Sequence, residues 1–184
     1  MRVLGIAGSL RRGSRNRALL RAAAAALPPG VELEPWERLS ALPHFDEDVE
    51  APVPAAVQEL RDAVAAADAV LIATPEYNTG VPGVLKNALD WLSRPFDGNP
   101  LRGKPVAVVG ASSGLFGAVW AQAEVRRVAA HLGAEVVERE LPVGLADDAF
   151  DGDGALADAG HAEALAALVG ELVGRVRERV AETA

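Results

Sequence analysis

The sequence predicts a single α/β domain in which helices cover both faces of a parallel sheet. Short apolar runs alternate with amphipathic segments along the chain, as in proteins built from repeated βα units. No internal repeat and no linker divides the sequence. Its 184 residues are enough for one domain with a sizeable core. We therefore expect one domain over residues 1–184.

Each expected strand is a short apolar run, and each expected helix has apolar residues at helical spacing. The strands are expected at residues 2–7, 31–35, 69–74, 105–111 and 135–141. The helices are expected at residues 16–27, 54–67, 82–94, 117–132 and 159–181. Five βα units of this kind suit a flavodoxin-like, doubly wound five-stranded parallel sheet in the order 2-1-3-4-5. The switch point of that order lies between the first and third strands.

The composition argues against several classes of function. Because the chain has no cysteine, it has no disulfides, thiolate nucleophiles or cysteine-ligated metal centres, and redox chemistry needs a bound cofactor. A net charge of −8 argues against nonspecific nucleic-acid binding. No apolar stretch approaches the roughly 20 residues that cross a bilayer, and the first residues lack a signal-peptide pattern. We expect a cytoplasmic protein with neither nucleic acid nor membrane as a partner.

The most informative segment is a tight polar loop after the expected third strand. It contains Pro75, Glu76, Tyr77 and Asn78, and Tyr77 is the only tyrosine of the chain. In open parallel sheets, ligands bind in the crevice outside the carboxyl ends of the strands. Loop backbone groups, an aromatic ring and an amide suit a flat heteroaromatic ligand with many hydrogen-bonding edges.

The loop after the expected first strand carries the groups that bind a phosphate dianion. Ser9 and Ser14 offer hydroxyls, Asn16 an amide, and Arg11 and Arg12 guanidinium groups. The following helix adds backbone N–H groups at its positive end. Helix capping explains Ser14 or Asn16 alone, but not the whole cluster. Neither a P-loop nor a dinucleotide fingerprint is present, so we expect a single phosphate here.

A third loop, after the expected fourth strand, contains Ser112 and Ser113 among glycines. Small residues allow a ligand edge to approach the backbone closely. Many ordinary turns share this composition, so the loop alone is a weak signal. Together, however, the three loops are expected to line one crevice.

Two segments depart from the regular pattern. Residues 36–53 form a long connection with His44 and Phe45, which either covers the ligand or packs its own apolar residues on the surface. Residues 144–160 are acidic but match a calcium loop only in part, and a solvated loop explains them better. We expect no metal site.

The expected helix 82–94 carries a possible subunit contact. Leu85 and Leu89 belong to its core stripe, whereas Trp91 lies off that stripe among polar residues. Exposed tryptophans of this kind are enriched in protein interfaces. An indole lying flat under a neighbouring loop fits the pattern equally well.

The loop motifs resemble the NAD(P)H-dependent FMN reductase family, which includes quinone, chromate and azo-dye reductases. The resemblance covers essentially the whole chain in length and motif order. It rests on Gly8-Ser9-Leu10-Arg11 with Ser14 and Asn16, on Pro75-Glu76-Tyr77-Asn78, and on Pro82-Gly83, Leu85-Lys86-Asn87-Ala88 and Asp90-Trp91.

The resemblance implies a role for each loop. The first loop would hold the FMN phosphate through Ser9, Arg11, Ser14 and Asn16. The second would hold the isoalloxazine ring through Pro75, Glu76, Tyr77 and Asn78. The third would close the ring pocket with Ser112 and Ser113. Family members are commonly homodimers or homotetramers, with the helix after the second loop near the interface.

The expected function is that of an FMN-dependent oxidoreductase. It takes hydride from NADPH or NADH at flavin N5 and reduces quinone-like or other small acceptors in a two-electron, ping-pong cycle. Because the flavin supplies this chemistry, we expect no catalytic protein residue, and we expect Glu76 to shape its loop rather than act as a base. Two alternatives stay open: a flavodoxin-like electron carrier, whose acidic balance suits basic partners, and a flavin-binding regulatory protein.

Overall fold

The computed structural model describes residues 1–183, so the last residue of the expected domain lies outside the described residues. Within residues 1–183 the strands form one parallel sheet in the order β2-β1-β3-β4-β5, and β6 also pairs with β4. The strands are β1 (Arg2–Ala7), β2 (Glu32–Trp36), β3 (Ala69–Thr74), β4 (Pro105–Ala111), β5 (Glu135–Val136) and β6 (Pro142–Val143). The flavodoxin-like order predicted from the sequence is confirmed.

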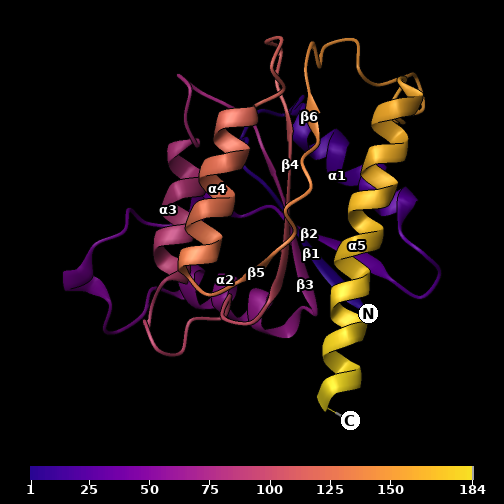
Figure 1. Ribbon diagram of the computed structural model, residues 1–184. Coiled ribbons are helices and arrows are strands. Elements are labelled where there is room, and N and C mark those ends of the chain that lie inside the picture. Colours follow the sequence, from indigo (N-terminus) through magenta and orange to yellow (C-terminus); the bar gives the residue numbers. More distant parts are fainter. Residues whose placement is uncertain (184) are drawn as a thin grey trace.

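Helices cover both faces of this sheet, as predicted (Figure 1). One face carries α1 (Arg15–Ala26) and α5 (Ala159–Thr183). The other carries α2 (Ala55–Ala66), α3 (Gly83–Leu92) and α4 (Val119–His131). Two short 3-10 helices, η1 (Leu39–Ala41) and η2 (Glu47–Val49), lie in the connection between β2 and α2.

The central strands are apolar throughout because both of their faces are covered. Every residue of β3 and β4 is buried. Side chains alternate between the two faces, so that Val70 and Ile72 pack toward α2, α3 and α4, whereas Leu71 and Ala73 pack toward α1 and α5. The carboxyl ends of the strands lie at the top of Figure 1, and there the loops bring polar groups together.

The fifth strand, expected to be continuous over residues 135–141, is broken into β5 and β6. Val136 pairs with Val106 and Pro142 with Gly110, so six residue steps of this strand oppose four steps of β4. Between the two pairings, residues 138–140 are charged and exposed, and Glu140 forms an ion pair with Arg126 of α4. Consecutive charged residues cannot enter a covered sheet, and the strand therefore bulges.

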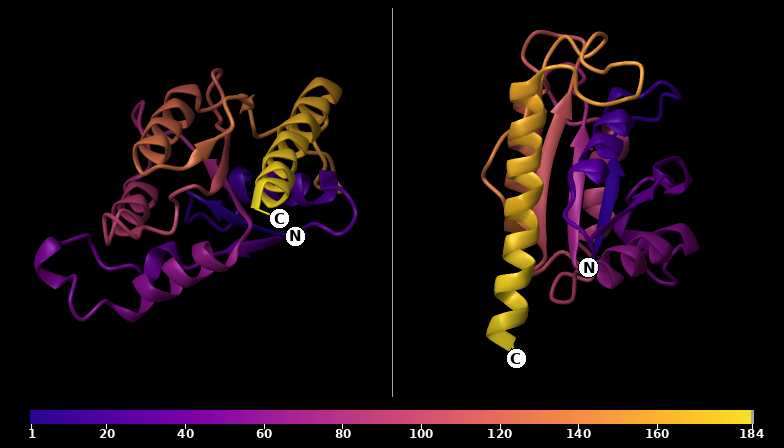
Figure 2. Two further views of the ribbon diagram at one scale, coloured as in Figure 1. Left: turned by 60° about the horizontal axis from the view of Figure 1, so that its bottom comes forward. Right: turned by 90° about the vertical axis from the view of Figure 1, so that its right-hand side faces the viewer.

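The long connection over residues 36–53 packs on α3. The backbone N–H of Phe45 donates to Asn87 Oδ1 at 2.7 Å, and Asn87 Nδ2 and Trp91 Nε1 both donate to the Pro43 carbonyl, at 2.9 and 2.8 Å. Figures 1 and 2 show the segment with η2 projecting beside α3, away from the carboxyl ends of the strands. The packing alternative therefore describes this loop better than a lid.

Trp91 is fully buried, with none of its surface exposed. Its ring meets Phe45 edge to face, with centroids 5.0 Å apart. The expectation that Trp91 contacts another subunit is therefore wrong, and the alternative of an indole beneath a neighbouring loop is right. The loop is also tied by Arg94, which pairs with Glu47 and Glu50. The hydrogen bond to Glu50 raises the pKa of Arg94 above its ordinary value, and Glu47 adds to this effect.

Two findings bear on the classes of function. No helix in residues 1–183 combines the length and apolar character needed to cross a membrane. In the same residues, no group of histidine, aspartate and glutamate side chains is placed to hold a metal ion.

Candidate active site

A crevice at the carboxyl edge of the sheet brings together the three loops singled out from the sequence. β1 and β3 are neighbours at the switch point, and the backbone N–H of Gly8 donates to the Ala73 carbonyl at 2.8 Å. The crevice is lined by Ser9, Arg11, Ser14, Arg15, Asn16, Pro75, Glu76, Tyr77, Ala111, Ser112, Ser113 and Asp147. Of the predicted site residues, all of which the structure describes, Asn78 alone is outside this lining.

The first loop presents a run of unused backbone donors. Ser14 caps α1 by accepting a hydrogen bond from the Arg17 backbone N–H at 3.3 Å. The five N–H groups of residues 12–16 have no acceptor within residues 1–183. Because they lie at the positive end of a helix, these donors favour an anion.

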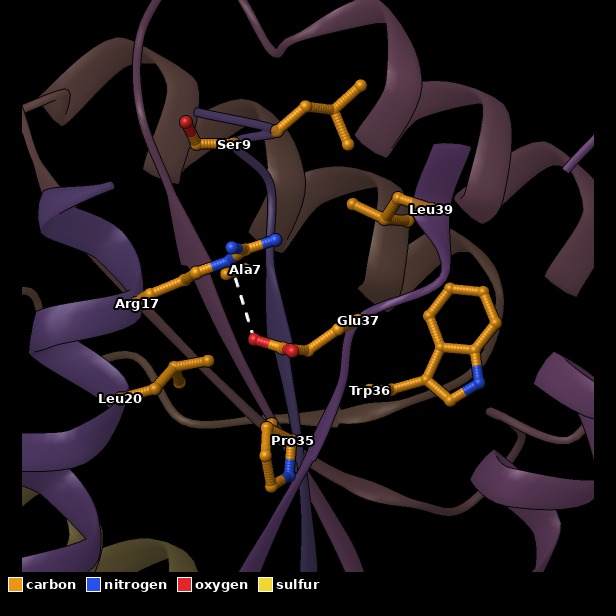
Figure 3. Close-up of a pocket in the computed structure, with 10 residues that line it drawn as sticks. Ala7, Ser9, Arg17, Leu20, Pro35, Trp36, Glu37 and Leu39 are labelled. Atoms are coloured by element: carbon orange, nitrogen blue, oxygen red, sulfur yellow. Dashed lines mark ion pairs between the residues drawn. The ribbon is translucent and has the colours of Figure 1, made fainter. Parts of the chain in front are cut away.

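Ion pairs decide which arginines near this loop are free to meet that anion. Arg15 pairs with Asp147 at 3.5 Å, and Arg17 pairs with Glu37 at 3.5 Å. Figure 3 shows Arg17 reaching from α1 toward Glu37, across a small hollow that Ser9 also lines. Arg11 forms no ion pair with any described residue and lines the crevice, so its guanidinium is available there.

Asn16 makes contacts that the sequence did not reveal. Its Nδ2 donates to the Ala111 carbonyl at 2.9 Å, its Oδ1 accepts from the Ala111 N–H at 3.0 Å, and the residue is 2% exposed. The amide therefore joins the start of α1 to the end of β4. Both polar atoms of the side chain are hydrogen-bonded to backbone groups of Ala111, and these bonds fix the distance between the first and third loops.

The second loop is a tight hairpin. Tyr77 and Gly80 exchange two backbone hydrogen bonds of 3.1 Å each, and Asn78 and Thr79 have φ angles of 51° and 63°. Positive φ at both central residues is the geometry of a type I′ turn. Asn tolerates this region, but the β-branched Thr79 adopts it only under strain. Such strain is often found at functional sites.

Glu76 is committed to the neighbouring helix. The backbone N–H groups of Trp120 and Ala121 both donate to its Oε2 at 3.1 Å. α4 has no side-chain cap of its own, because the N-cap residue is Ala118, with a φ of 61°. A carboxylate at this position satisfies two helix N–H groups and complements the helix dipole. This contact agrees with the expectation that Glu76 shapes its loop.

The first and second loops approach each other closely at Gly8. A Cβ atom on this glycine would lie 2.9 Å from Leu85 Cδ2 and 3.3 Å from Pro75 Cδ. A larger residue here would require the Leu85 side chain and Pro75 to shift. In the third loop, Ser112 is held by its backbone N–H, which donates to the Val143 carbonyl of β6 at 3.0 Å.

Sequence reasoning missed an apolar rim beside the third loop, formed by Leu115, Phe116 and Trp120. These side chains are 69%, 60% and 49% exposed, and the rings of Phe116 and Trp120 pack edge to face at 5.2 Å. It also missed Glu124, whose Oε2 accepts a hydrogen bond from the Val81 N–H at 3.2 Å. In the sequence, Glu124 is an ordinary polar residue on an amphipathic helix, and no signal sets it apart.

Strand order and crevice together define a class of protein. A flavodoxin-like sheet with acceptor-free N–H groups on its first loop and a strained hairpin on its third-strand loop is suited to a flat ligand that carries a phosphate. The sequence pattern of the NADPH-dependent FMN reductase family matches residues 1–148, and the chain belongs to this family.

Individual relatives agree with this assignment. An NAD(P)H-dependent FMN reductase of Pseudomonas aeruginosa is 46% identical over 160 residues, which cover 86% of this chain and 85% of the relative. A quinone reductase of Escherichia coli is 40% identical over 141 residues, covering 76% and 74%. The solved structure of FerB, a flavoenzyme NAD(P)H:(acceptor) oxidoreductase from Paracoccus denitrificans, superposes with a TM-score of 0.85 at 34% identity, covering 96% and 97%.

Proposed function

We propose that this protein binds FMN in the crevice, oxidises NADPH or NADH, and reduces small quinone-like acceptors. One observation carries the proposal. The acceptor-free N–H groups of residues 12–16 and the hairpin over residues 75–81 lie at the same switch point of the sheet. The reductase activities named for the relatives support the same function.

The first loop fits the phosphate end of FMN. The hydroxyls of Ser9 and Ser14, the guanidinium of Arg11 and the free N–H groups would hold the phosphate oxygens. Hydrogen bonds to a charged group contribute about 1.5–3 kcal/mol each, so a few of them account for selection of the phosphate. Asn16 would act by holding this loop against β4.

The second and third loops fit the ring end. Pro75, Glu76, Tyr77 and Asn78 would present backbone groups and the Tyr77 ring to the isoalloxazine, and Ser112 and Ser113 would close the opposite side. When bound, FMN supplies the two-electron exchange between nicotinamide and acceptor. The protein's own residues would bind and orient the reactants, and Glu76 would keep its carboxylate on the backbone N–H groups of α4. One crevice would admit the two substrates in turn, which gives ping-pong kinetics.

We also propose a homodimer or homotetramer that covers the apolar rim of Leu115, Phe116 and Trp120. The exposed rings of Phe116 and Trp120 pack against each other, and Leu115, next to Phe116 in the chain, is also exposed, which suits a surface that a second subunit covers. Trp91 is buried within its own chain and has no part in this contact. A cytoplasmic location and a single domain over the whole chain stay predictions from the sequence.

The phosphate site is tested by comparing FMN with riboflavin, which lacks the phosphate. We expect FMN to bind more tightly, and we expect Arg11→Ala to weaken FMN about tenfold while leaving riboflavin unchanged. Arg12→Ala is the matched control, because Arg12 is the adjacent arginine but does not line the crevice. Fluorescence titration measures both ligands. Equal affinity of the unchanged protein for FMN and riboflavin would contradict the assignment.

A further inference from the structure

We infer that Glu76 and Glu124 form a carboxylate clamp that holds the hairpin over residues 75–81 in its ring-binding shape. Both are positioning residues, since neither needs to touch the flavin to act. The inference rests on the proposed function for its consequence, but the clamp itself is a property of the chain without any ligand.

The two carboxylates tie the hairpin to α4 from opposite directions. Glu76 stands at the start of the hairpin, and its Oε2 accepts from the helix N–H groups of Trp120 and Ala121, at 3.1 Å each. Glu124 stands on α4, and its Oε2 accepts from the N–H of Val81 at the end of the hairpin, at 3.2 Å. The two ties therefore bracket the turn on both sides.

The hairpin needs such ties because its turn is exposed, although Pro75 at its start is buried and Val81 at its end packs against the core. A two-residue hairpin on its own is at best marginally stable in water. Thr79 is β-branched and has a φ of 63°, so the free turn would relax to another geometry. Tyr77 is 48% exposed, and its burial contributes little. Charge-assisted hydrogen bonds at both ends oppose this relaxation.

The clamp acts on the ring end of the crevice and not on the phosphate end. The hairpin supplies the ring end, whereas the donors for the phosphate lie in the first loop and at the start of α1. Loosening the hairpin should therefore weaken every ligand that carries the isoalloxazine ring, whether or not it carries a phosphate. The phosphate site should keep its own selectivity.

The clamp can be observed without flavin, because Tyr77 is the only tyrosine in the chain. Protein grown with 3-fluorotyrosine gives one fluorine NMR signal, which reports on the hairpin alone. We expect Glu76→Ala and Glu124→Ala each to move this signal toward its position in the urea-unfolded protein. Glu76→Gln keeps an oxygen that accepts both N–H groups, so it should restore most of the original shift. Glu178→Ala, an exposed glutamate near the far end of α5, is the control and should leave the signal unchanged.

The second measurement is the affinity of the same variants for FMN and for riboflavin. We expect Glu76→Ala and Glu124→Ala to raise both dissociation constants by a similar factor, about tenfold, so that the ratio of the two constants is conserved. If the variants lower the thermal unfolding midpoint while the fluorine signal and both affinities stay as in the unchanged protein, the carboxylates only cap the helix and the clamp is wrong.

The two experiments separate this inference from the proposed function. If the unchanged protein binds no flavin while the fluorine signal moves as expected, the clamp stands as a structural device and the proposed function fails. If FMN and riboflavin bind normally to the alanine variants, the clamp fails and the proposed function stands. Where an alanine variant does not fold by circular dichroism, Glu76→Leu or Glu124→Leu takes its place, because leucine keeps apolar bulk but has no acceptor for the N–H groups.

Discussion

Asn16 and Glu76 both direct their polar atoms to backbone groups of a neighbouring element. Asn16 satisfies Ala111 of β4, and Glu76 satisfies the first turn of α4. The sequence indicated that both residues lie at the site, because their spacing within the loops was visible. It did not reveal their partners, because Ala111, Trp120 and Ala121 contribute only backbone atoms. Every residue type has these atoms, so the sequence does not indicate which residues take part. For the same reason Asn16 was taken for a phosphate ligand rather than a tie between loops.

Replacing Asn16 tests this tie. Asn16→Ala leaves the N–H and carbonyl of Ala111 without partners, and we expect the free energy of unfolding to fall by about 1–3 kcal/mol. Asn16→Asp keeps an acceptor for the N–H but brings a negative charge against the carbonyl, so we expect a loss at least as large. Urea unfolding measures both variants, and FMN titration should show weaker binding in each. Unchanged stability in Asn16→Ala would show that the amide contributes no net stabilisation.

The bounds of the strands and helices with a strong apolar periodicity were predicted closely from the sequence. The structure of the connections between them was not. The core runs of β3 and β4 are buried as expected, because an uninterrupted apolar run has no other stable place. The break between β5 and β6 was missed, since apolar residues on both sides masked the charged segment at residues 138–140. The docking of residues 36–53 on α3 depends on contacts distant in sequence, such as that between Pro43 and Trp91.

The docked loop gives a prediction at the scale of the element. Trp91→Phe keeps an aromatic ring against Phe45 but loses the hydrogen bond to the Pro43 carbonyl, and we expect a loss of about 1 kcal/mol in the free energy of unfolding. Trp91→Ala also leaves a cavity, and we expect a loss of about 3–5 kcal/mol. Light scattering should give the same mass for Trp91→Phe and the unchanged protein. A smaller species for Trp91→Phe would contradict this account and would indicate that Trp91 contributes to a subunit contact.

At the scale of the whole molecule, exposed apolar side chains gather at the carboxyl edge. Among the described residues, the large ones on the loops and helix start of this edge are Leu10, Tyr77, Leu115, Phe116, Trp120 and Leu145. The sequence predicted the crevice here, because three polar loops follow neighbouring strands. It did not predict the rim, since exposure depends on how residues 112–118 turn away from the core. The proposed flavin site and the proposed subunit contact therefore both lie at this edge.

The proposed oligomer can be tested through the rim. Phe116→Glu or Trp120→Glu places a charge where a second copy would bury it. We therefore expect the mass in light scattering to fall to that of one chain for a dimer, or of two chains for a tetramer with a second contact. Val49→Glu is the control, because Val49 is 45% exposed on η2, away from the carboxyl edge. If the rim variants keep the mass of the unchanged protein, the subunit contact lies elsewhere.

The central claim is that the crevice binds FMN and allows a nicotinamide nucleotide to reduce it. The most direct test is to load the protein with FMN, mix it with NADPH or NADH without oxygen, and follow the visible absorbance of the flavin. We expect at least one nucleotide to bleach this absorbance rapidly, and benzoquinone to restore it. If neither nucleotide bleaches the flavin while dithionite does, the protein is a flavin-binding carrier or regulator, and the reductase assignment is wrong.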